Sequence, residues 1–231
     1  MKKFLVGGLL VVWAMAAVIF SQLIVGYPMS WILGESMNLP VWNAIYSALS
    51  YTVALLLIIF VPWKLFKKWQ TNRVELGLRG WPTWTDLGLA PVGFIVSLIL
   101  AAVFVAIFSQ FPWFNAEEAQ DVGFNYLASG GDKIVAFITL VIVAPIAEEI
   151  IFRGWLYGKL RKIANIPMAI LVVSLAFALV HFQWNVSVNV FAMSIVLCGL
   201  REVTGTIYSG IIMHMIKNGV AFYLLYILGI S

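Results

Sequence analysis

Two adjacent glutamates near the end of an apolar run have the clearest chemical potential in the sequence. The stretch 137–151 is apolar except for Thr139 and the pair Glu148-Glu149, and Arg153 follows it closely. One ionisable side chain at membrane depth costs at least about 2.5–3.5 kcal/mol to insert. On a helix, Glu149 and Arg153 would share a face because they are four residues apart. We therefore expect Arg153 to pair with Glu149, which leaves Glu148 available for chemistry.

The two histidines of the sequence lie in the same apolar C-terminal half as the glutamates. They are His181 and His214, and Asn218 follows His214 by one helical turn. A single histidine in a membrane helix is more often a structural hydrogen bonder than a functional residue. All the histidines together with two acids and an asparagine in one half of the chain favour a functional site instead.

Three kinds of chemistry use such a set of side chains. In hydrolysis, Glu148 would act as general base on a water that His181 orients. His214 and Asn218 would then donate hydrogen bonds to the developing oxyanion. Alternatively, Glu148, His181 and His214 could bind Zn²⁺ with water as the fourth ligand, or the acids could form a proton relay in a transporter. The His-Glu-x-x-His, Gly-x-Ser-Gly and Gly-x-Gly-Asp motifs of other intramembrane cleavage mechanisms are absent from the sequence.

The composition predicts the scaffold that must position these residues. Hydrophobic residues make up 63% of the 231 residues and charged residues only 10%, with a mean hydropathy of +1.00. Soluble domains carry about 25% charged residues, so we expect an all-α, polytopic transmembrane bundle of about seven spans. The fifth and sixth spans should be short or irregular. The expected spans are 4–25, 42–62, 87–110, 133–152, 168–181, 186–200 and 206–230.

Charges in the connections predict the orientation of the bundle. Basic residues precede the first span and fill the second connection and the connection after the fourth span, whereas the third connection is acidic. The positive-inside rule places the N-terminus in the cytoplasm and the C-terminus outside. The first span reads as an uncleaved signal-anchor, and the basic second connection as an amphipathic segment held on anionic lipid. The acidic residues of the third connection are Glu117, Glu118, Asp121 and Asp132.

Three motifs in order resemble the signature of the CPBP family (CAAX protease and bacteriocin-processing), also called the Abi or type II CAAX prenyl protease family. The signature reads Glu-Glu-x-x-x-Arg, then Phe-x-x-x-His, then His-x-x-x-Asn/Asp. Here it corresponds to Glu148-Glu149…Arg153, Phe177…His181 and His214…Asn218. The resemblance implies a catalytic core over residues 74–231, preceded by two spans and a basic cytoplasmic connection in residues 1–73.

The resemblance also implies roles for the matched residues. Glu148 would activate the attacking water with help from His181, and His214 and Asn218 would stabilise the oxyanion. Glu149 and Arg153 would support this geometry, and Phe177 would pack against it. A metal-free mechanism without a cofactor is favoured, because Asn218 is a good oxyanion donor and a poor zinc ligand. The alternative is a zinc metalloendopeptidase that uses Glu148, His181 and His214.

By the same resemblance, the leading functional prediction is an intramembrane endopeptidase of the bacterial plasma membrane. Its substrates would be small membrane-associated peptides or proteins, such as bacteriocin or signalling-peptide precursors. The alternative is a non-proteolytic membrane partner of the same fold, for example a bacteriocin-immunity or scaffold protein. A proton-coupled transporter is less consistent with the sequence, which has no repeated halves. The expected partners are membrane lipid and a peptide or membrane-protein substrate, without nucleic acid, and no oligomeric state is predicted.

The site requires a particular arrangement of the fourth and fifth spans. If the fourth helix continues past Trp155 into the cytoplasm, the fifth span enters near residues 169–171 and His181 reaches mid-membrane. Glu148 and His181 should then be adjacent in the cytoplasmic half of a polar cavity. Lys217, inside the third motif, is expensive in mid-span and would weaken Glu148 as a base if it faced the cavity.

Overall fold

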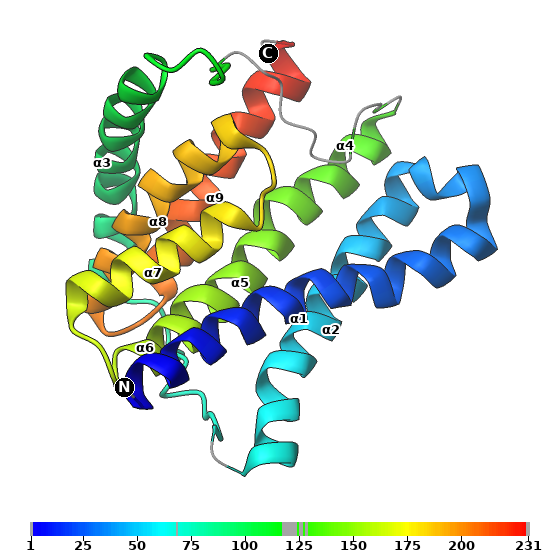
Figure 1. The fold of residues 1–231 in the computed structure, drawn as a ribbon. Helices are drawn as coiled ribbons and strands as arrows, with labels where there is room; N and C mark the ends of the chain where they lie inside the picture. Colours follow the sequence, from blue (N-terminus) through cyan, green and yellow to red (C-terminus); the bar gives the residue numbers. More distant parts are fainter. Residues whose placement is uncertain (1, 68, 117–123, 125–126, 128, 230–231) are drawn as a thin grey trace.

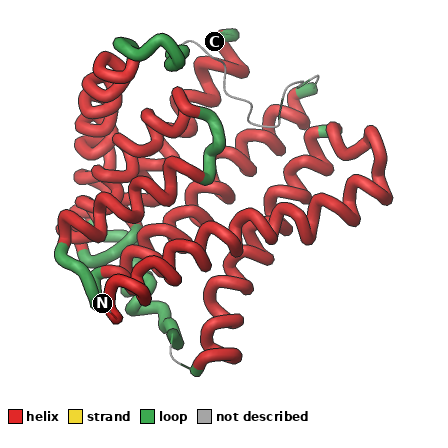
Figure 2. The backbone as a smooth tube through the Cα atoms, viewed as in Figure 1, coloured by secondary structure: helices red, strands yellow, loops and turns green. Residues whose placement is uncertain are grey.

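The chain folds as a bundle of helices. The structure is a computed structural model that describes residues 2–67, 69–116, 124, 127 and 129–229. Figure 2 shows helices joined by loops, and no strand occurs in these described ranges. The predicted all-α class is therefore confirmed. Glu117, Glu118 and Asp121, on which part of the orientation argument depended, lie outside the described residues.

The helices follow the predicted spans closely. In chain order they are α1 (Lys2–Leu33), the 3₁₀ turn η1 (Gly34–Asn38), α2 (Pro40–Phe66), α3 (Trp84–Phe108), α4 (Gly130–Phe137), α5 (Ala144–Glu149), α6 (Gly158–Leu160), α7 (Ile166–Leu179), α8 (Trp184–Thr204) and α9 (Tyr208–Phe222). Three π-helical segments are η2 (Ile138–Val143), η3 (Ile150–Tyr157) and η4 (Tyr223–Leu228). Among the described residues, six helices are long and apolar enough to cross a membrane, and α7 is a shorter apolar helix. A transmembrane bundle of about seven helices is therefore confirmed.

The fifth and sixth spans were both predicted to be short or irregular, and only the fifth is short. Helix α7 has 14 residues, which span about 21 Å against a hydrocarbon core of about 30 Å. Helix α8 has 21 residues, so the prediction of a short sixth span is wrong. Its apolar run is interrupted near both ends by polar residues, which hid the helix ends in the sequence. These residues include Asn185, Ser187, Arg201 and Glu202.

The middle of the bundle is one long helix built from α4, η2, α5, η3 and α6. Figure 1 shows it between a hairpin of α1 and α2 on one side and α7, α8 and α9 on the other. Helix α3 packs against α8 and α9, and α2 packs against α4 and α5. The start of α1 and the end of η4 lie at opposite ends of the bundle (Figure 1). The core is formed largely by the second half of the chain, where Phe152, Trp155, Phe177, Leu197 and Met213 are fully buried.

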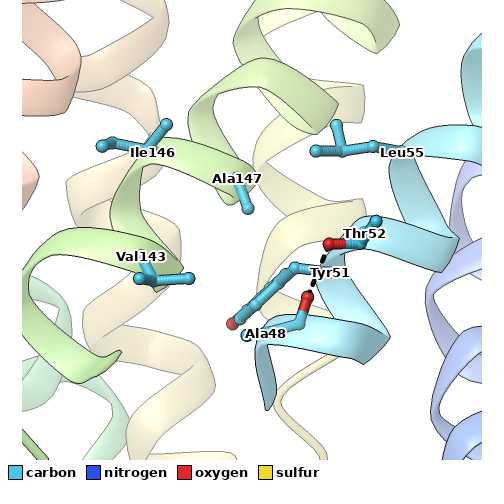
Figure 3. Close-up of a pocket in the computed structure, with 7 residues that line it drawn as sticks. All are labelled: Ala48, Tyr51, Thr52, Leu55, Val143, Ile146 and Ala147. Atoms are coloured by element: carbon cyan, nitrogen blue, oxygen red, sulfur yellow. Dashed lines mark hydrogen bonds between the residues drawn. The ribbon is translucent and has the colours of Figure 1, made fainter. Parts of the chain in front are cut away.

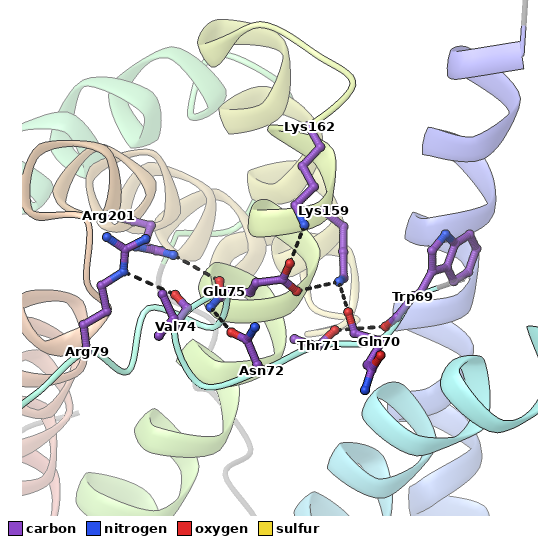
Figure 4. A network of polar contacts seen from close by, with 10 residues as sticks. All are labelled: Trp69, Gln70, Thr71, Asn72, Val74, Glu75, Arg79, Lys159, Lys162 and Arg201. Carbon is purple, nitrogen blue, oxygen red and sulfur yellow. Dashed lines mark hydrogen bonds and ion pairs between the residues drawn. The ribbon is translucent and has the colours of Figure 1, made fainter. Parts of the chain in front are cut away.

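The connection between α2 and α3 is folded against the bundle. We call residues 69–83 the 69–83 strap. Its Glu75 accepts hydrogen bonds from Lys162 at 2.7 Å and from Lys159 at 3.1 Å. Lys159 also donates to the Gln70 carbonyl oxygen at 3.0 Å, and Arg201 donates to the Glu75 carbonyl oxygen at 3.2 Å. Figure 4 shows these contacts joining the strap to the end of the central helix and to α8. The strap is therefore held to the bundle at Glu75. The anchoring of the basic connection on anionic lipid stays a prediction.

Candidate active site

Both glutamates lie where the central helix changes its winding. Glu148 and Glu149 end the short α5, which has π-helical segments on both sides. Pro145 at the start of α5 has no N–H to donate to the preceding turn. Single π-helical turns inside α-helices often occur at functional sites because they leave backbone groups unpaired and reorient side chains. The acid pair therefore lies on an irregular part of the central helix.

Glu149 is the centre of a buried charge cluster. Its Oε1 accepts a 2.9 Å hydrogen bond from Arg153 and lies 3.2 Å from Nδ1 of His214. Glu149 and Arg153 are completely buried, and His214 is 3% exposed. The Arg153 guanidinium also stacks over the Phe177 ring at 4.3 Å, as cations do on aromatic faces. The pairing expected from the spacing of Glu149 and Arg153 is thus present, and Phe177 contributes a cation–π contact in addition to packing.

Glu148 has a different environment. Its Oε1 accepts a 2.6 Å hydrogen bond from the hydroxyl of Tyr51 on α2. Its Oε2 lies 3.7 Å from Nε2 of His214, and 17% of its side chain is exposed. His214 therefore stands between the two acids, with one ring nitrogen toward each. Of the two acids, Glu149 is paired with Arg153, whereas Glu148 accepts a hydrogen bond from the phenol of Tyr51 and faces His214.

His181 lies in the turn directly after α7, where the chain reverses. Its Nδ1 lies 2.8 Å from the Phe177 carbonyl oxygen, and a carbonyl can only accept, so Nδ1 carries the proton. In the neutral ring, Nε2 then presents a lone pair. Phe182, with φ of 54°, turns the chain immediately afterwards, and Ser187 donates to the Ala178 carbonyl oxygen at 2.9 Å. The turn that carries His181 is therefore fixed by its own hydrogen bonds.

His181 and Glu148 lie at comparable distances along their helices from the same end of the bundle, and their adjacency stays a prediction. The central helix continues to Leu160, so Glu148 lies about 18 Å from that end. Helix α7 begins at Ile166 at the same end, which places His181 about 22 Å along it. His181 interacts electrostatically with Glu148 and His214, and its ring is 5.0 Å from that of Phe177. The expected continuation past Trp155 is present, and Lys162 beyond it is 56% exposed at its side chain.

The third motif occupies α9, where the geometry differs from the simplest expectation. Asn218 donates a 2.9 Å hydrogen bond to the Leu140 carbonyl oxygen in the π-helical segment η2. One of its two amide hydrogens is therefore already used. Lys217 interacts electrostatically with Glu148 and with His181. The effect of Lys217 on Glu148 as a base stays a prediction.

The three side chains that could bind Zn²⁺ are engaged by other groups. Within the described part of the chain, no three His, Cys, Asp or Glu side chains are grouped closely enough to hold one. His214 bridges the two acids, and His181 is bonded to a backbone carbonyl through Nδ1. A zinc site at Glu148, His181 and His214 would therefore need a rearrangement of these side chains. Metal independence itself stays a prediction.

Tyr51 contacts Glu148 but belongs to none of the three sequence motifs. It lies on α2, and a tyrosine in an apolar span is commonly read as an aromatic belt residue. Belt residues sit near span ends, whereas Tyr51 is near the middle of α2 between Ser50 and Thr52. That mid-span polar group was the available signal.

Comparison with known proteins agrees with the motif analysis over the second half of the chain. Residues 130–220 match the family model described as type II CAAX prenyl endopeptidase Rce1-like. The UPF0177 protein YxdF of Lactococcus lactis subsp. lactis (strain IL1403) is 28% identical over 141 residues, which cover 58% of this chain and 70% of the relative. No solved structure matches the chain. Over residues 130–220 this integral membrane protein is therefore similar to the Rce1-like type II CAAX prenyl endopeptidases, and the resemblance carried by its three motifs is confirmed.

Proposed function

We propose that this protein is an intramembrane endopeptidase in which Glu148 activates the attacking water. The observation that carries the proposal is the difference between the two acids: Glu149 is held by Arg153, whereas Oε2 of Glu148 faces Nε2 of His214 at 3.7 Å. The match of residues 130–220 to CAAX prenyl endopeptidases supports peptide-bond hydrolysis as the reaction.

In the proposed first step, Glu148 takes a proton from water while the water oxygen bonds to the carbonyl carbon of the substrate. His181 would accept a hydrogen bond at Nε2 from the other O–H of the water, because its Nδ1 proton is committed to the Phe177 carbonyl oxygen. When the carbon–nitrogen bond breaks, Glu148 would return its proton to the leaving amine. The histidine tautomer supports an orienting role for His181.

Stabilisation of the oxyanion is assigned to α9. His214 is one donor in this scheme, and Asn218 can offer the amide hydrogen that is not bonded to Leu140. Removal of one oxyanion donor typically lowers kcat by about 10²–10³.

The substrate class is proposed from the surroundings of the site. A pocket of about 270 Å³ lies between α2 and the central helix, as Figure 3 shows. Its lining is almost entirely apolar: Ala48, Tyr51, Thr52, Leu55, Val143, Ile146 and Ala147. Tyr51 lies both in this lining and against Glu148. We propose a short membrane-associated peptide with an apolar side chain or lipid group near the cleaved bond.

For location, we propose the plasma membrane of a bacterium with the N-terminus in the cytoplasm. The relative from Lactococcus lactis supports a bacterial setting. The bundle end that carries the 69–83 strap also holds Lys159, Arg161, Lys162 and Arg201, as the positive-inside rule requires of a cytoplasmic face.

The test is cleavage of a peptide library by the purified protein, read by mass spectrometry. The library contains farnesylated CAAX peptides, bacteriocin and signalling-peptide precursors, and unlipidated apolar peptides. We expect Glu148→Gln to lower cleavage by at least about 10²-fold, as loss of a general base does. Elemental analysis and activity in strong chelator, measured on the same preparation, test the metal-free mechanism.

Two results would contradict the proposal. Cleavage that survives Glu148→Gln would remove Glu148 from the chemistry. A folded wild-type protein that cleaves none of the peptides would favour the non-proteolytic partner of the same fold. Stoichiometric zinc that is lost together with activity would keep the protease but replace its mechanism.

A further inference from the structure

Helix α2 lies outside the matched residues 130–220, yet it brings a phenol into the acid cluster. The hydroxyl of Tyr51 donates a 2.6 Å hydrogen bond to Oε1 of Glu148. Helix α2 packs against α5 and against both neighbouring π-helical segments, so the contact depends on how the N-terminal hairpin docks on the central helix. Figure 3 shows the Tyr51 ring reaching from α2 toward the central helix.

The two oxygens of Glu148 are divided between different partners. Oε1 is occupied by Tyr51, and Oε2 faces Nε2 of His214 at 3.7 Å. A carboxylate that is bonded at one oxygen loses its freedom to rotate about the end of the side chain. A catalytic group must be held to within about 0.5 Å of its productive position. The Tyr51 bond thus supplies the fixed orientation that a base at Oε2 needs.

We propose that Tyr51 is a positioning residue for Glu148, so that α2 forms part of the active unit of the protease proposed above, on which this assignment rests. Tyr51 holds Oε1 and directs Oε2 toward the histidines. Its ring also lines the apolar pocket between α2 and the central helix. The hydroxyl and the ring therefore have separable effects: the hydroxyl acts on the rate of the chemical step and the ring on substrate binding.

Tyr51→Phe separates these effects because it keeps the ring and removes the hydroxyl. The probe is whichever library peptide the wild-type protein cleaves, and its kcat and KM are measured for each variant. We expect kcat to fall about 10- to 100-fold with KM unchanged, since a hydrogen bond to a charged group is lost. Tyr46→Phe is the matched control, because Tyr46 is a tyrosine of the same helix whose ring lies beside Gly26 of α1. We expect its kcat to stay within twofold of the wild-type value.

A second pair of variants distinguishes positioning from simple packing of α2. Glu148→Asp draws the carboxylate back from Tyr51 by one methylene. In that background we expect Tyr51→Phe to change the remaining kcat less than about twofold, because the bond is already broken. If Tyr51 only held α2 in place, the penalty would be the same in both backgrounds.

Each other outcome is also decisive. An active wild type with an equally active Tyr51→Phe overturns this assignment alone. Failure of Tyr51→Phe to fold, or a change confined to KM, also overturns it, because the hydroxyl would then be structural or the residue would act only on binding. A wild-type protein that cleaves no peptide overturns the proposed function and this assignment with it.

Discussion

Arg153 illustrates how much a single buried charge depends on its partner. It is completely buried, bonded to Glu149 through Nη1, and stacked on Phe177. Its Nε and Nη2 have no hydrogen-bond partner among the described residues. A buried cation in this position is stable only while the carboxylate beside it is ionised.

We therefore predict that Glu149→Gln destabilises the protein by about 3–5 kcal/mol, because it leaves Arg153 charged and unpaired. The double variant Glu149→Gln with Arg153→Met should recover most of this loss, because it removes both charges. Unfolding in detergent measures both proteins. If the single and double variants were equally unstable, the ion pair between Glu149 and Arg153 would not offset the cost of burying its two charges.

At the level of the elements, the close approach of α9 to α5 depends on Gly210 of α9, which has no side chain. A Cβ atom at Gly210 would lie 3.0 Å from Oε2 of Glu149 and 3.5 Å from Leu197. Glu149 cannot move away easily, since Arg153 and His214 both hold its other oxygen. The helix must therefore shift if this position gains a methyl group.

We predict that Gly210→Ala destabilises the protein by about 1–3 kcal/mol through overpacking and lowers cleavage by displacing His214. Gly199→Ala on α8 is the matched control, because a Cβ there meets nothing within 4 Å. That control should stabilise its helix by about 0.5–1 kcal/mol. If the two variants had the same stability and activity, close packing of α9 on Glu149 would not matter.

The spans could be predicted from the sequence because long apolar runs and their flanking charges are local signals. The Glu149–Arg153 pair was equally predictable, because four residues make one helical turn. The bond from Asn218 to the Leu140 carbonyl was not, since the two residues are on different helices. Tyr51 was missed for a related reason: its partner is on another helix, and no spacing within α2 encodes that packing.

At the scale of the whole molecule, hydrogen bonds cross the boundary at residue 74, and the division of the chain there stays a prediction. The core proposed from the motifs begins inside the 69–83 strap, which is bonded to the central helix and to α8. The hairpin of α1 and α2 likewise reaches the acid site through Tyr51. The sequence motifs identified the candidate site in the second half of the chain, but the first half supplies contacts to it that no motif includes.

The attachment of the 69–83 strap to the bundle should depend on pH. Hydrogen bonds from Lys162, and then from Lys159, hold the pKa of the Glu75 carboxyl below its ordinary value of 4.5. A carboxyl whose pKa is lowered by folding stabilises the folded state above its unfolded pKa and loses that contribution as the pH falls through its folded pKa. The contribution of Glu75 is therefore complete at neutral pH and is lost in acid, as the pH falls below 4.5 through the lowered pKa.

We predict that Glu75→Gln loosens the strap at pH 7, so that limited proteolysis within residues 69–83 becomes faster. The difference from the wild type should shrink as the pH falls below 4.5, because the wild-type carboxyl then takes up its proton and weakens the same two lysine contacts. Glu35→Gln is the control, since Glu35 is exposed in the turn between α1 and α2 and is outside this network. Below pH 4.5 the measurement uses a protease that is active in acid, such as pepsin. A difference that persisted unchanged into acid would mean that the shape of Glu75, and not its charge, holds the strap to the bundle.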